Sequence, residues 1–367
     1  MFFYDFPNLL AILIVIIVSF RFGIIPMWLS FFLGVFALTP FFLNNVLFSP
    51  GYMPDQWQYY DLTQSIRSFA LDHPKESVPV ETSSWMLALI PMPYIETIQS
   101  LGFFNRLITT ILIIWLYSKK NLRGWALLFM VFYPSLLLYS SLALRDTLVL
   151  MFMVLSVIFF LENRRLLAIL VSLPLLVIKF QNFFLIIVFF VVHLYFSRDS
   201  IIYRFRYIFA IFIIASIAPF LLSIIEILDQ SRLYMYIDDG GYRSAYEHIR
   251  TIEDFTIIAI KSAPYFLMKP LPWEADSFLT FLQSFENIFV FIFLGYMLIQ
   301  TSRFDRQIAL KWLIYLFAAL SIYGLVVYNF GTAVRYKFPF IVIVIVGMAY
   351  ELYIKHGKLI INKSTKL

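Results

Sequence analysis

Residues 164–198 read RRLLAILVSLPLLVIKFQNFFLIIVFFVVHLYFSR. Arginines stand at both ends, and about 31 almost entirely apolar residues, from Leu166 to Phe196, lie between them. A helix rises about 1.5 Å per residue and the hydrocarbon core of a bilayer is about 30 Å thick, so this length predicts two short helices that turn at Lys179. Each arm would be only about 20 Å long, so we expect the turn to lie below the membrane surface.

The rest of the chain has the same character. Of its 367 residues, 62% are hydrophobic and 14% are charged. The sequence therefore predicts an all-α, polytopic integral membrane protein that forms a single transmembrane domain over residues 1–367. It has no cysteine, which excludes disulfides, a thiolate nucleophile and a cysteine-ligated metal. The first apolar run follows Asp5 without an early basic region, so we expect it to be retained as a span.

The apolar runs predict about eleven spans. They lie near residues 6–20, 24–48, 103–118, 124–142, 147–161, 166–178, 183–197, 207–226, 285–300, 312–328 and 337–353.

Positive charges orient these spans. With the N-terminus outside, sixteen of the 28 lysines and arginines fall in short inner segments: Arg21; Lys119, Lys120, Arg123; Arg164, Arg165; Arg198, Arg204, Arg206; Arg303, Arg306, Lys311; Lys355, Lys358, Lys363, Lys366. The net charge of +6 is explained by this orientation, so we expect no nucleic-acid partner. The C-terminus is predicted to be cytoplasmic.

Two long outer segments remain, residues 49–102 and 227–284. They are the stretches large enough to form a lid or a binding surface. Sugars present apolar ring faces that stack on aromatic side chains, and hydroxyls that carboxylates accept. Side chains of both kinds occur in these segments: Trp57, Tyr59, Tyr60, Trp273, Asp55, Asp61 and Glu274.

Five cations fall at or below the outer surface in this arrangement, where a membrane protein carries few positive charges. They are Arg145, Lys179, Lys269, Arg335 and Lys337. Arginine binds phosphate through two parallel, charge-assisted hydrogen bonds. These positions therefore favour an anionic substrate, and several of them at one membrane face favour a lipid-linked pyrophosphate.

Structural interpretations stand beside this one. Lys179 could extend outward along its own apolar stem, Asp146 could cap the helix that it begins, and Arg335 and Lys337 could belong to an interfacial anchor belt. Arg145 and Asp146 are neighbours in the chain and would not face each other on a helix, so each requires another partner.

Three motifs resemble those of a known family. They are Pro-Ser-Leu-Leu…Leu-Arg-Asp-Thr at 134–147, Pro-Leu-Pro-Trp-Glu at 270–274 and Gly-Thr-Ala-Val-Arg-Tyr-Lys-Phe-Pro at 331–339. With the number of spans and the large outer segments, they resemble bacterial O-antigen or capsule polymerases of the Wzy type. The resemblance implies a fold similar to that of the GT-C glycosyltransferases, all helical with a periplasmic cavity, in the bacterial inner membrane.

The activity that the resemblance implies is polymerisation of undecaprenyl pyrophosphate-linked oligosaccharide repeat units at the periplasmic face. The growing glycan would move from its lipid carrier onto a new lipid-linked unit. Donor lipid, acceptor lipid, the bilayer and a chain-length regulator protein would be the partners.

Roles for individual residues follow from this activity. Arg145, Lys179 and Arg335 would stabilise the charge that grows on the leaving pyrophosphate. A general base would take a proton from the acceptor hydroxyl; Asp55, Asp61, Glu274 and His248 all have suitable locations. Asp55 and Asp61 are favoured because the first outer loop of GT-C-like enzymes often carries the base, although this chain lacks the paired acidic signature there. The remaining substrate contacts are expected at Asp146, Tyr336, Lys269, Trp273, Glu274 and His248.

Two other functions are considered. Another lipid-linked sugar transferase would be favoured by a closely spaced acidic pair in the first outer segment, which the sequence lacks. A flippase or transporter would be favoured by charges at mid-membrane depth and by two similar halves, and neither is evident. Glu274 and Asp276 could bind a divalent metal, but such carboxylates are more often solvated, so we expect no metal and no cofactor.

Overall fold

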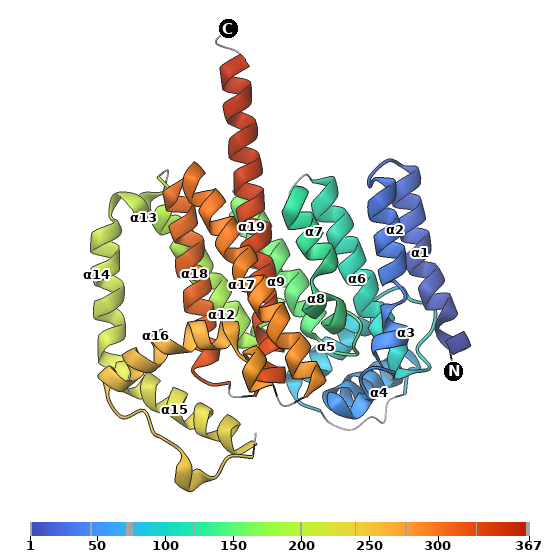
Figure 1. Ribbon diagram of the computed structural model, residues 1–367, viewed down its shortest axis with the longest axis horizontal. Coiled ribbons are helices and arrows are strands. Elements are labelled where there is room, and N and C mark those ends of the chain that lie inside the picture. The colour runs from blue at the N-terminus through green and yellow to red at the C-terminus, as the bar shows by residue number, and fades with distance from the viewer. Residues whose placement is uncertain are drawn as a thin grey trace. The chain divides into compact units, whose positions relative to one another are not determined.

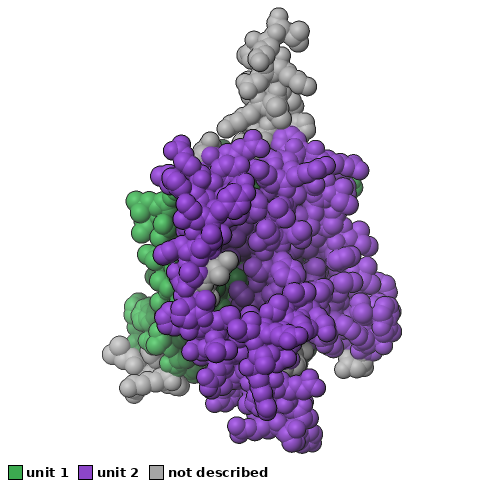
Figure 2. Space-filling view, turned by 90° about the vertical axis from the view of Figure 1, so that its left-hand side faces the viewer, with its two compact units in different colours: residues 1–186, 349–367 green, residues 187–348 purple. Residues whose placement is uncertain are grey.

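The computed structural model describes residues 2–44, 46–70, 76–119, 122–198, 200–238, 240–275, 277–327 and 329–364. It is 80% helical, and the described residues contain no strand, which confirms the all-α prediction. The chain divides into two compact units, residues 1–186 with 349–367, and residues 187–348 (Figure 2). Three residues of the sequence predictions, Lys120, Asp276 and Lys366, lie outside the described residues.

The first unit consists of short and medium helices (Figure 1). They are α1 (Phe6–Arg21), α2 (Met27–Phe36), α3 (Thr39–Leu43), α4 (Asp55–Arg67), α5 (Val78–Ala88), α6 (Ile98–Ser118), α7 (Gly124–Phe132), α8 (Pro134–Tyr139), α9 (Asp146–Leu161), α10 (Arg165–Ser172), α11 (Pro174–Ile178) and the start of α12 (Phe180–Phe196).

The second unit continues from α12. It contains α13 (Ile201–Arg204), α14 (Arg206–Ile217), α15 (Leu221–Asp238), α16 (Ile252–Met268), α17 (Phe278–Phe304), α18 (Arg306–Gly324) and most of the apolar part of α19 (Phe330–Ser364). Short 3-10 helices occur in the two units at Phe2–Asp5, Pro50–Tyr52, Ala218–Phe220, Arg243–Ala245 and Pro272–Glu274.

Five helical segments are long and apolar enough to cross a membrane. They are Ile98–Ser118, Arg206–Asp238, Phe278–Phe304, Arg306–Gly324 and Phe330–Tyr353. Five shorter apolar segments accompany them: Phe6–Arg21, Met27–Leu43, Asp146–Leu161, Arg165–Ile178 and Phe180–Phe196. The protein is thus a multi-pass, all-α membrane protein, while the predicted number of eleven spans is not confirmed.

Proline explains why several predicted spans are divided. It has no N–H to donate and its ring clashes with the preceding turn, so it is favoured in the first turn of a new helix. Pro134 begins α8 and Pro174 begins α11, so the predicted spans 124–142 and 166–178 are each two helices. Pro219 lies in the 3-10 turn between α14 and α15, where the helix axis changes direction (Figure 1).

The first outer segment forms two helices, α4 and α5, that pack on each other. α4 also packs on α6, and α5 on α11. The end of α1 that bears the N-terminus is bonded to the start of α6: the buried Asp5 carboxylate accepts hydrogen bonds from Thr97 Oγ1 and Ser100 Oγ at 2.5 Å each. The N-terminus and the end of the first outer segment therefore lie together within the first unit.

The second outer segment, residues 227–284, contains most of α15, a loop, α16 and the start of α17. Buried Ile225 of α15, Ile249 of the loop and Leu325 at the end of α18 form an apolar cluster. This cluster attaches the loop between α15 and α16 to the helices of the second unit.

Candidate functional site

The hairpin turn at Lys179 and the start of α9 meet in a buried ion pair. Lys179 Nζ lies 3.4 Å from Asp146 Oδ1, and the two side chains are only 8% and 1% exposed. Lys179 occupies the break between α11 and α12, and Asp146 is the first residue of α9. The alternative in which Lys179 extends to the surface is therefore wrong, because its ammonium is buried beside a carboxylate.

Arg145 precedes Asp146 in the chain and differs from it in its hydrogen bonding. Its Nε is buried and has no hydrogen-bond partner among the described residues, while the side chain as a whole is partly exposed. A buried, unpaired guanidinium nitrogen is costly unless a ligand or water completes it. The Arg145–Asp146–Lys179 cluster thus contains an ion pair, Lys179 with Asp146, and a second cation, Arg145. The Nε of Arg145 has no hydrogen-bond partner among the described residues.

Side chains of other helices hold the segment that carries Arg145. Residues 140–145 form no regular helix, so their backbone groups need partners from elsewhere. Asn105 of α6 donates its Nδ2 to the carbonyls of Leu142 and Leu144 at 2.7 Å each, and Gln56 of α4 accepts from the Ala143 N–H at 2.9 Å. The position of Arg145 therefore depends on α4 and α6.

Arg106 is a buried cation that the sequence analysis did not select. Its Nε donates to the Phe36 carbonyl at 2.9 Å and its Nη1 to Ser140 Oγ at 2.6 Å, with 3% of the residue exposed. The signal in the sequence was an arginine within the apolar run of α6. Arg106 therefore bonds the start of the 140–145 segment to the end of α2 through Ser140 and Phe36.

The candidate residues of the first outer segment differ in their exposure to solvent. Asp55 begins α4 and is half-buried, whereas Asp61 is exposed on the same helix. Tyr59 and Tyr60, expected to stack on sugars, are 2% and 8% exposed and offer no open ring face. Trp57 is 45% exposed and can offer one.

In the second unit, Lys269 and Glu274 form a local pair. Lys269 Nζ bonds to Glu274 Oε1, and Glu274 Oε2 accepts from the Leu271 N–H at 2.9 Å. Both charged groups are therefore bonded within the turn between Lys269 and Glu274. The neighbouring Trp273 is 79% exposed, which leaves its ring face open for stacking.

Lys337 has a structural role, and the anchor-belt interpretation is wrong for it. The residue is 1% exposed, and its Nζ donates to Asn287 Oδ1 at 2.6 Å and to the Leu267 carbonyl at 3.1 Å. Asn287 Nδ2 in turn donates to the Lys269 carbonyl at 2.9 Å. A cation is favourable where a helix ends because the last carbonyls carry negative charge. Lys337 thus joins the 331–339 motif to the end of α16, directly before the 270–274 motif.

Arg335 and Tyr336 lie beside it in α19. Arg335 is 9% exposed, so it too is buried rather than anchored at an interface. The Tyr336 ring lies 5.2 Å from the ring of Tyr323. The candidates therefore divide between the units, with Arg145 and Lys179 in the first and Arg335 and Tyr336 in the second.

His248 has a partner that the sequence did not indicate. Its Nδ1 lies 2.7 Å from Oδ2 of Asp229, a residue of α15 that is 19 positions earlier and 8% exposed. A carboxylate that orients a histidine is common where the histidine transfers protons. Asp229 and His248 are 19 residues apart in the chain, which is too far for a local sequence pattern to relate them.

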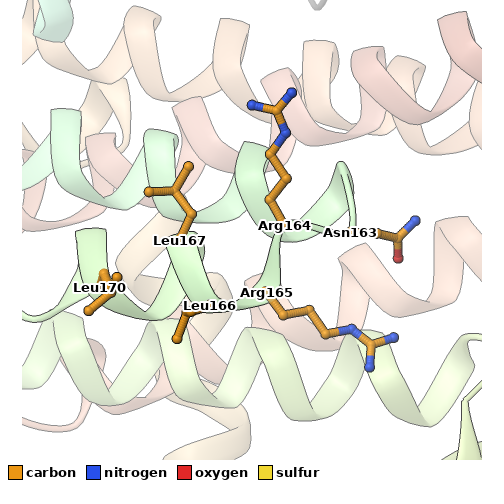
Figure 3. Close-up of a pocket in the computed structure, with 6 residues that line it drawn as sticks. All are labelled: Asn163, Arg164, Arg165, Leu166, Leu167 and Leu170. Atoms are coloured by element: carbon orange, nitrogen blue, oxygen red, sulfur yellow. The ribbon is translucent and has the colours of Figure 1, made fainter.

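A groove of about 720 Å³ lies at the turn between α9 and α10. It is lined by Asn163, Arg164, Arg165, Leu166, Leu167 and Leu170. The two arginines extend in different directions (Figure 3), and Arg164 pairs with Glu162 at 3.6 Å. Asp146 stands at the opposite end of α9, about 24 Å away along the helix, so the groove is separate from the Arg145–Asp146–Lys179 cluster.

The described residues contain no group of three or more histidine, aspartate or glutamate side chains arranged to hold a metal ion. Comparison with protein-family models, with curated proteins and with solved structures finds no match to this chain.

Proposed function

We propose that this protein polymerises undecaprenyl pyrophosphate-linked oligosaccharide repeat units by glycosyl transfer. The reaction would take place at the periplasmic face of the bacterial inner membrane, with the N-terminus outside and the C-terminus in the cytoplasm. The donor and acceptor lipids would be its substrates, and a chain-length regulator its protein partner.

The observation that carries the proposal is the Arg145–Asp146–Lys179 cluster. Lys179 is buried and Arg145 is partly buried at one end of α9, and a buried nitrogen of the arginine has no partner among the described residues. Cations at such depth are rare in membrane proteins without an anion to bind. A pyrophosphate oxygen would complete the Arg145 donor and share Lys179 with Asp146.

This arrangement suits the departure of a pyrophosphate. As the bond between the anomeric carbon and the pyrophosphate oxygen breaks, negative charge grows on that oxygen, and fixed donors stabilise it. Arg145 serves this role on the proposal, with Lys179 as a further contact for the lipid-linked substrate. The exposed ring of Trp57, in the same unit, would bind a sugar face.

The test is a reaction with purified components. The protein in nanodiscs is incubated with authentic undecaprenyl pyrophosphate-linked repeat units, and the products are resolved by length. A ladder spaced by one repeat unit is expected.

Each of the other outcomes identifies another function. Addition of one sugar or transfer to a different acceptor would indicate another GT-C-type glycosyltransferase. Unchanged lipid in the reaction, together with its movement between leaflets in proteoliposomes, would indicate a flippase.

A further inference from the structure

The groove at the turn between α9 and α10 belongs to a helical hairpin of the first unit. α9 begins at Asp146, and after the turn α10 and α11 return over Arg165–Ile178 and pack on α9. The Lys179–Asp146 ion pair joins the two arms at their far ends. The groove and the ion pair therefore mark opposite ends of one hairpin.

Backbone hydrogen bonds fix the shape of the turn. Asn163 has a φ of 63°, in the left-handed region that asparagine adopts more easily than most residues. The Arg164 N–H donates to the Phe159 carbonyl at 2.9 Å, and the Asn163 N–H donates to the Phe160 carbonyl at 3.0 Å. These two bonds form the Schellman pattern of a helix end. Arg164 and the residue after it, Arg165, therefore start from a defined backbone position.

An apolar stripe on α10 begins at the groove. One side of this helix is fixed to α9, because Ala168 is fully buried and its carbonyl accepts from Ser156 Oγ at 2.7 Å. Leu166, Leu170 and Leu173 are instead exposed. Their spacing of four and three residues places them on one face of the helix. The groove thus continues into a row of leucines that runs along the hairpin.

The groove carries one excess positive charge. It is lined by two exposed cations, Arg164 and Arg165. Arg164 Nε lies 3.6 Å from Glu162 Oε2, so the carboxylate balances one of the two charges. Arg165 makes no hydrogen bond or ion pair within the part of the chain that the structure describes, and it extends away from Arg164 (Figure 3). Its guanidinium is the cation that can accept a ligand without first losing a partner.

We propose that this groove binds an anionic glycerophospholipid of the surrounding membrane. The phosphodiester accepts from the planar fork of Arg165, and Arg164 adds positive charge beside it. One acyl chain lies along the stripe formed by Leu166, Leu170 and Leu173. Basic pockets where membrane helices reach the surface bind anionic head groups in this way. The inference does not depend on the proposed glycosyl transfer.

The chemistry of the groove favours this occupant over three others. A soluble phosphate would leave the row of leucines uncovered. A zwitterionic phospholipid has no net negative charge to balance the excess cation. A lipid-linked pyrophosphate is assigned to the other end of α9, where Arg145 lies about 24 Å away along the helix. An anionic phospholipid matches both the charge and the apolar stripe.

The experiment measures lipid binding to the purified protein after its lipids have been removed in a neutral detergent. Native mass spectrometry follows titrations with phosphatidylglycerol and with phosphatidylcholine of identical acyl chains. Glycerol phosphate tests the head group alone, and undecaprenyl phosphate tests the polyprenyl alternative. Thermal unfolding with and without each lipid provides a second readout, because a ligand that binds the folded state raises the melting temperature.

Four variants test the groove. Arg165→Ala and Arg165→Gln both remove the cation, and the second keeps a polar side chain in case the first does not fold. Glu162→Gln removes the carboxylate that balances Arg164. Arg21→Ala is the control, because Arg21 is an exposed cation in the last turn of α1 and does not line the groove.

The wild-type protein should bind one phosphatidylglycerol about 10-fold more tightly than phosphatidylcholine. Both Arg165 variants should lose about 10-fold in affinity for phosphatidylglycerol, the contribution expected of a hydrogen bond between charged groups. Glu162→Gln should gain about 2-fold, the size of an exposed ion pair. Arg21→Ala should bind both lipids as the wild-type protein does. The melting temperature gained from phosphatidylglycerol should shrink in the Arg165 variants only.

Three results would overturn the inference. An affinity for phosphatidylglycerol that is unchanged in both Arg165 variants would exclude the groove. Equal losses in Arg165→Gln and Arg21→Ala would show that the total positive charge, rather than a site, attracts the lipid. Binding of glycerol phosphate as tight as that of phosphatidylglycerol, or tighter binding of undecaprenyl phosphate that depends on Arg165, would assign the groove to another ligand.

Discussion

Lys179 Nζ lies 3.4 Å from Asp146 Oδ1, and both side chains are buried. The pair joins the break between α11 and α12 to the first turn of α9, 33 residues earlier in the chain. A buried pair of this kind is costly to desolvate and is not by itself a source of stability. On the proposed function, the pair would hold a cation beside Arg145 where an anionic lipid head group binds.

The Lys179–Asp146 pair can be tested by removing one charge and then both. Lys179→Met alone leaves the Asp146 carboxylate buried without the Lys179 ammonium, which should destabilise the protein by about 3–5 kcal/mol. The double variant Lys179→Met with Asp146→Leu removes both charges and should recover most of that stability. Thermal unfolding in detergent measures both effects.

Activity should not recover with stability in the double variant, because the cation for the pyrophosphate is still absent. The ladder reaction provides this readout. A double variant that is as stable as the wild-type protein and polymerises at the wild-type rate would show that the pair serves packing only.

Polymerisation should depend on the planar shape of the Arg145 guanidinium as well as on its positive charge. Arg145→Ala should abolish polymer at unchanged protein abundance, and Arg145→Lys should restore it only in part, because an ammonium replaces a planar fork with a point charge. Arg21→Ala is the matched control, since Arg21 is an exposed cation in the same unit. Polymer length on gels measures all three, and full activity of Arg145→Ala would contradict the pyrophosphate role.

Gly102 of α6 allows the 140–145 segment to approach closely. A Cβ at this position would collide with the backbone carbonyl oxygen of Ser141. Gly102→Ala should therefore destabilise the protein by roughly 1–3 kcal/mol and displace the segment that carries Arg145. Gly295→Ala in α17 is the control, because no atom lies within 4 Å of the added Cβ. Melting temperatures should fall for the first variant only.

Asn287 links Lys337 to the end of α16 and should contribute to stability. Asn287→Ala removes an acceptor from the buried Lys337 and a donor from the carbonyls of Met268 and Lys269. Unsatisfied buried groups cost about 1–3 kcal/mol each, so the loss should be measurable by thermal unfolding. Gln58→Ala, at an exposed position of α4, should unfold like the wild-type protein. Equal melting temperatures for the two variants would contradict the structural role of Lys337.

Topology can be measured directly because the chain has no cysteine. Single cysteines at the exposed positions Ser68, Ser244 and Asn163 provide unique labels. In intact inner-membrane vesicles or spheroplasts, a membrane-impermeant thiol reagent should label Ser68→Cys and Ser244→Cys from the periplasm. Asn163→Cys should be labelled only after the membrane is permeabilised. The reverse pattern would invert the proposed orientation.

The sequence alone was sufficient for the class of fold and for part of the candidate site. Apolar runs bounded by basic residues predict a helical membrane protein because the bilayer leaves few alternatives for backbone hydrogen bonds. The same length argument placed Lys179 at a break between two short helices, as the structure shows. The number of spans was less predictable, because Pro134, Pro174 and Pro219 divide apolar runs that composition alone treats as continuous.

Only the tertiary structure decided which charges have partners. Lys179 with Asp146, Lys337 with Asn287 and His248 with Asp229 are separated by 33, 50 and 19 residues, respectively. No local periodicity relates such positions, because each pair forms where two helices or a helix and a loop are brought together by packing. The sequence determined that cations lie in a helical membrane protein. The folded chain determined that Lys337 closes a helix end, that Lys179 is neutralised beside Arg145, and that His248 is oriented by a buried carboxylate.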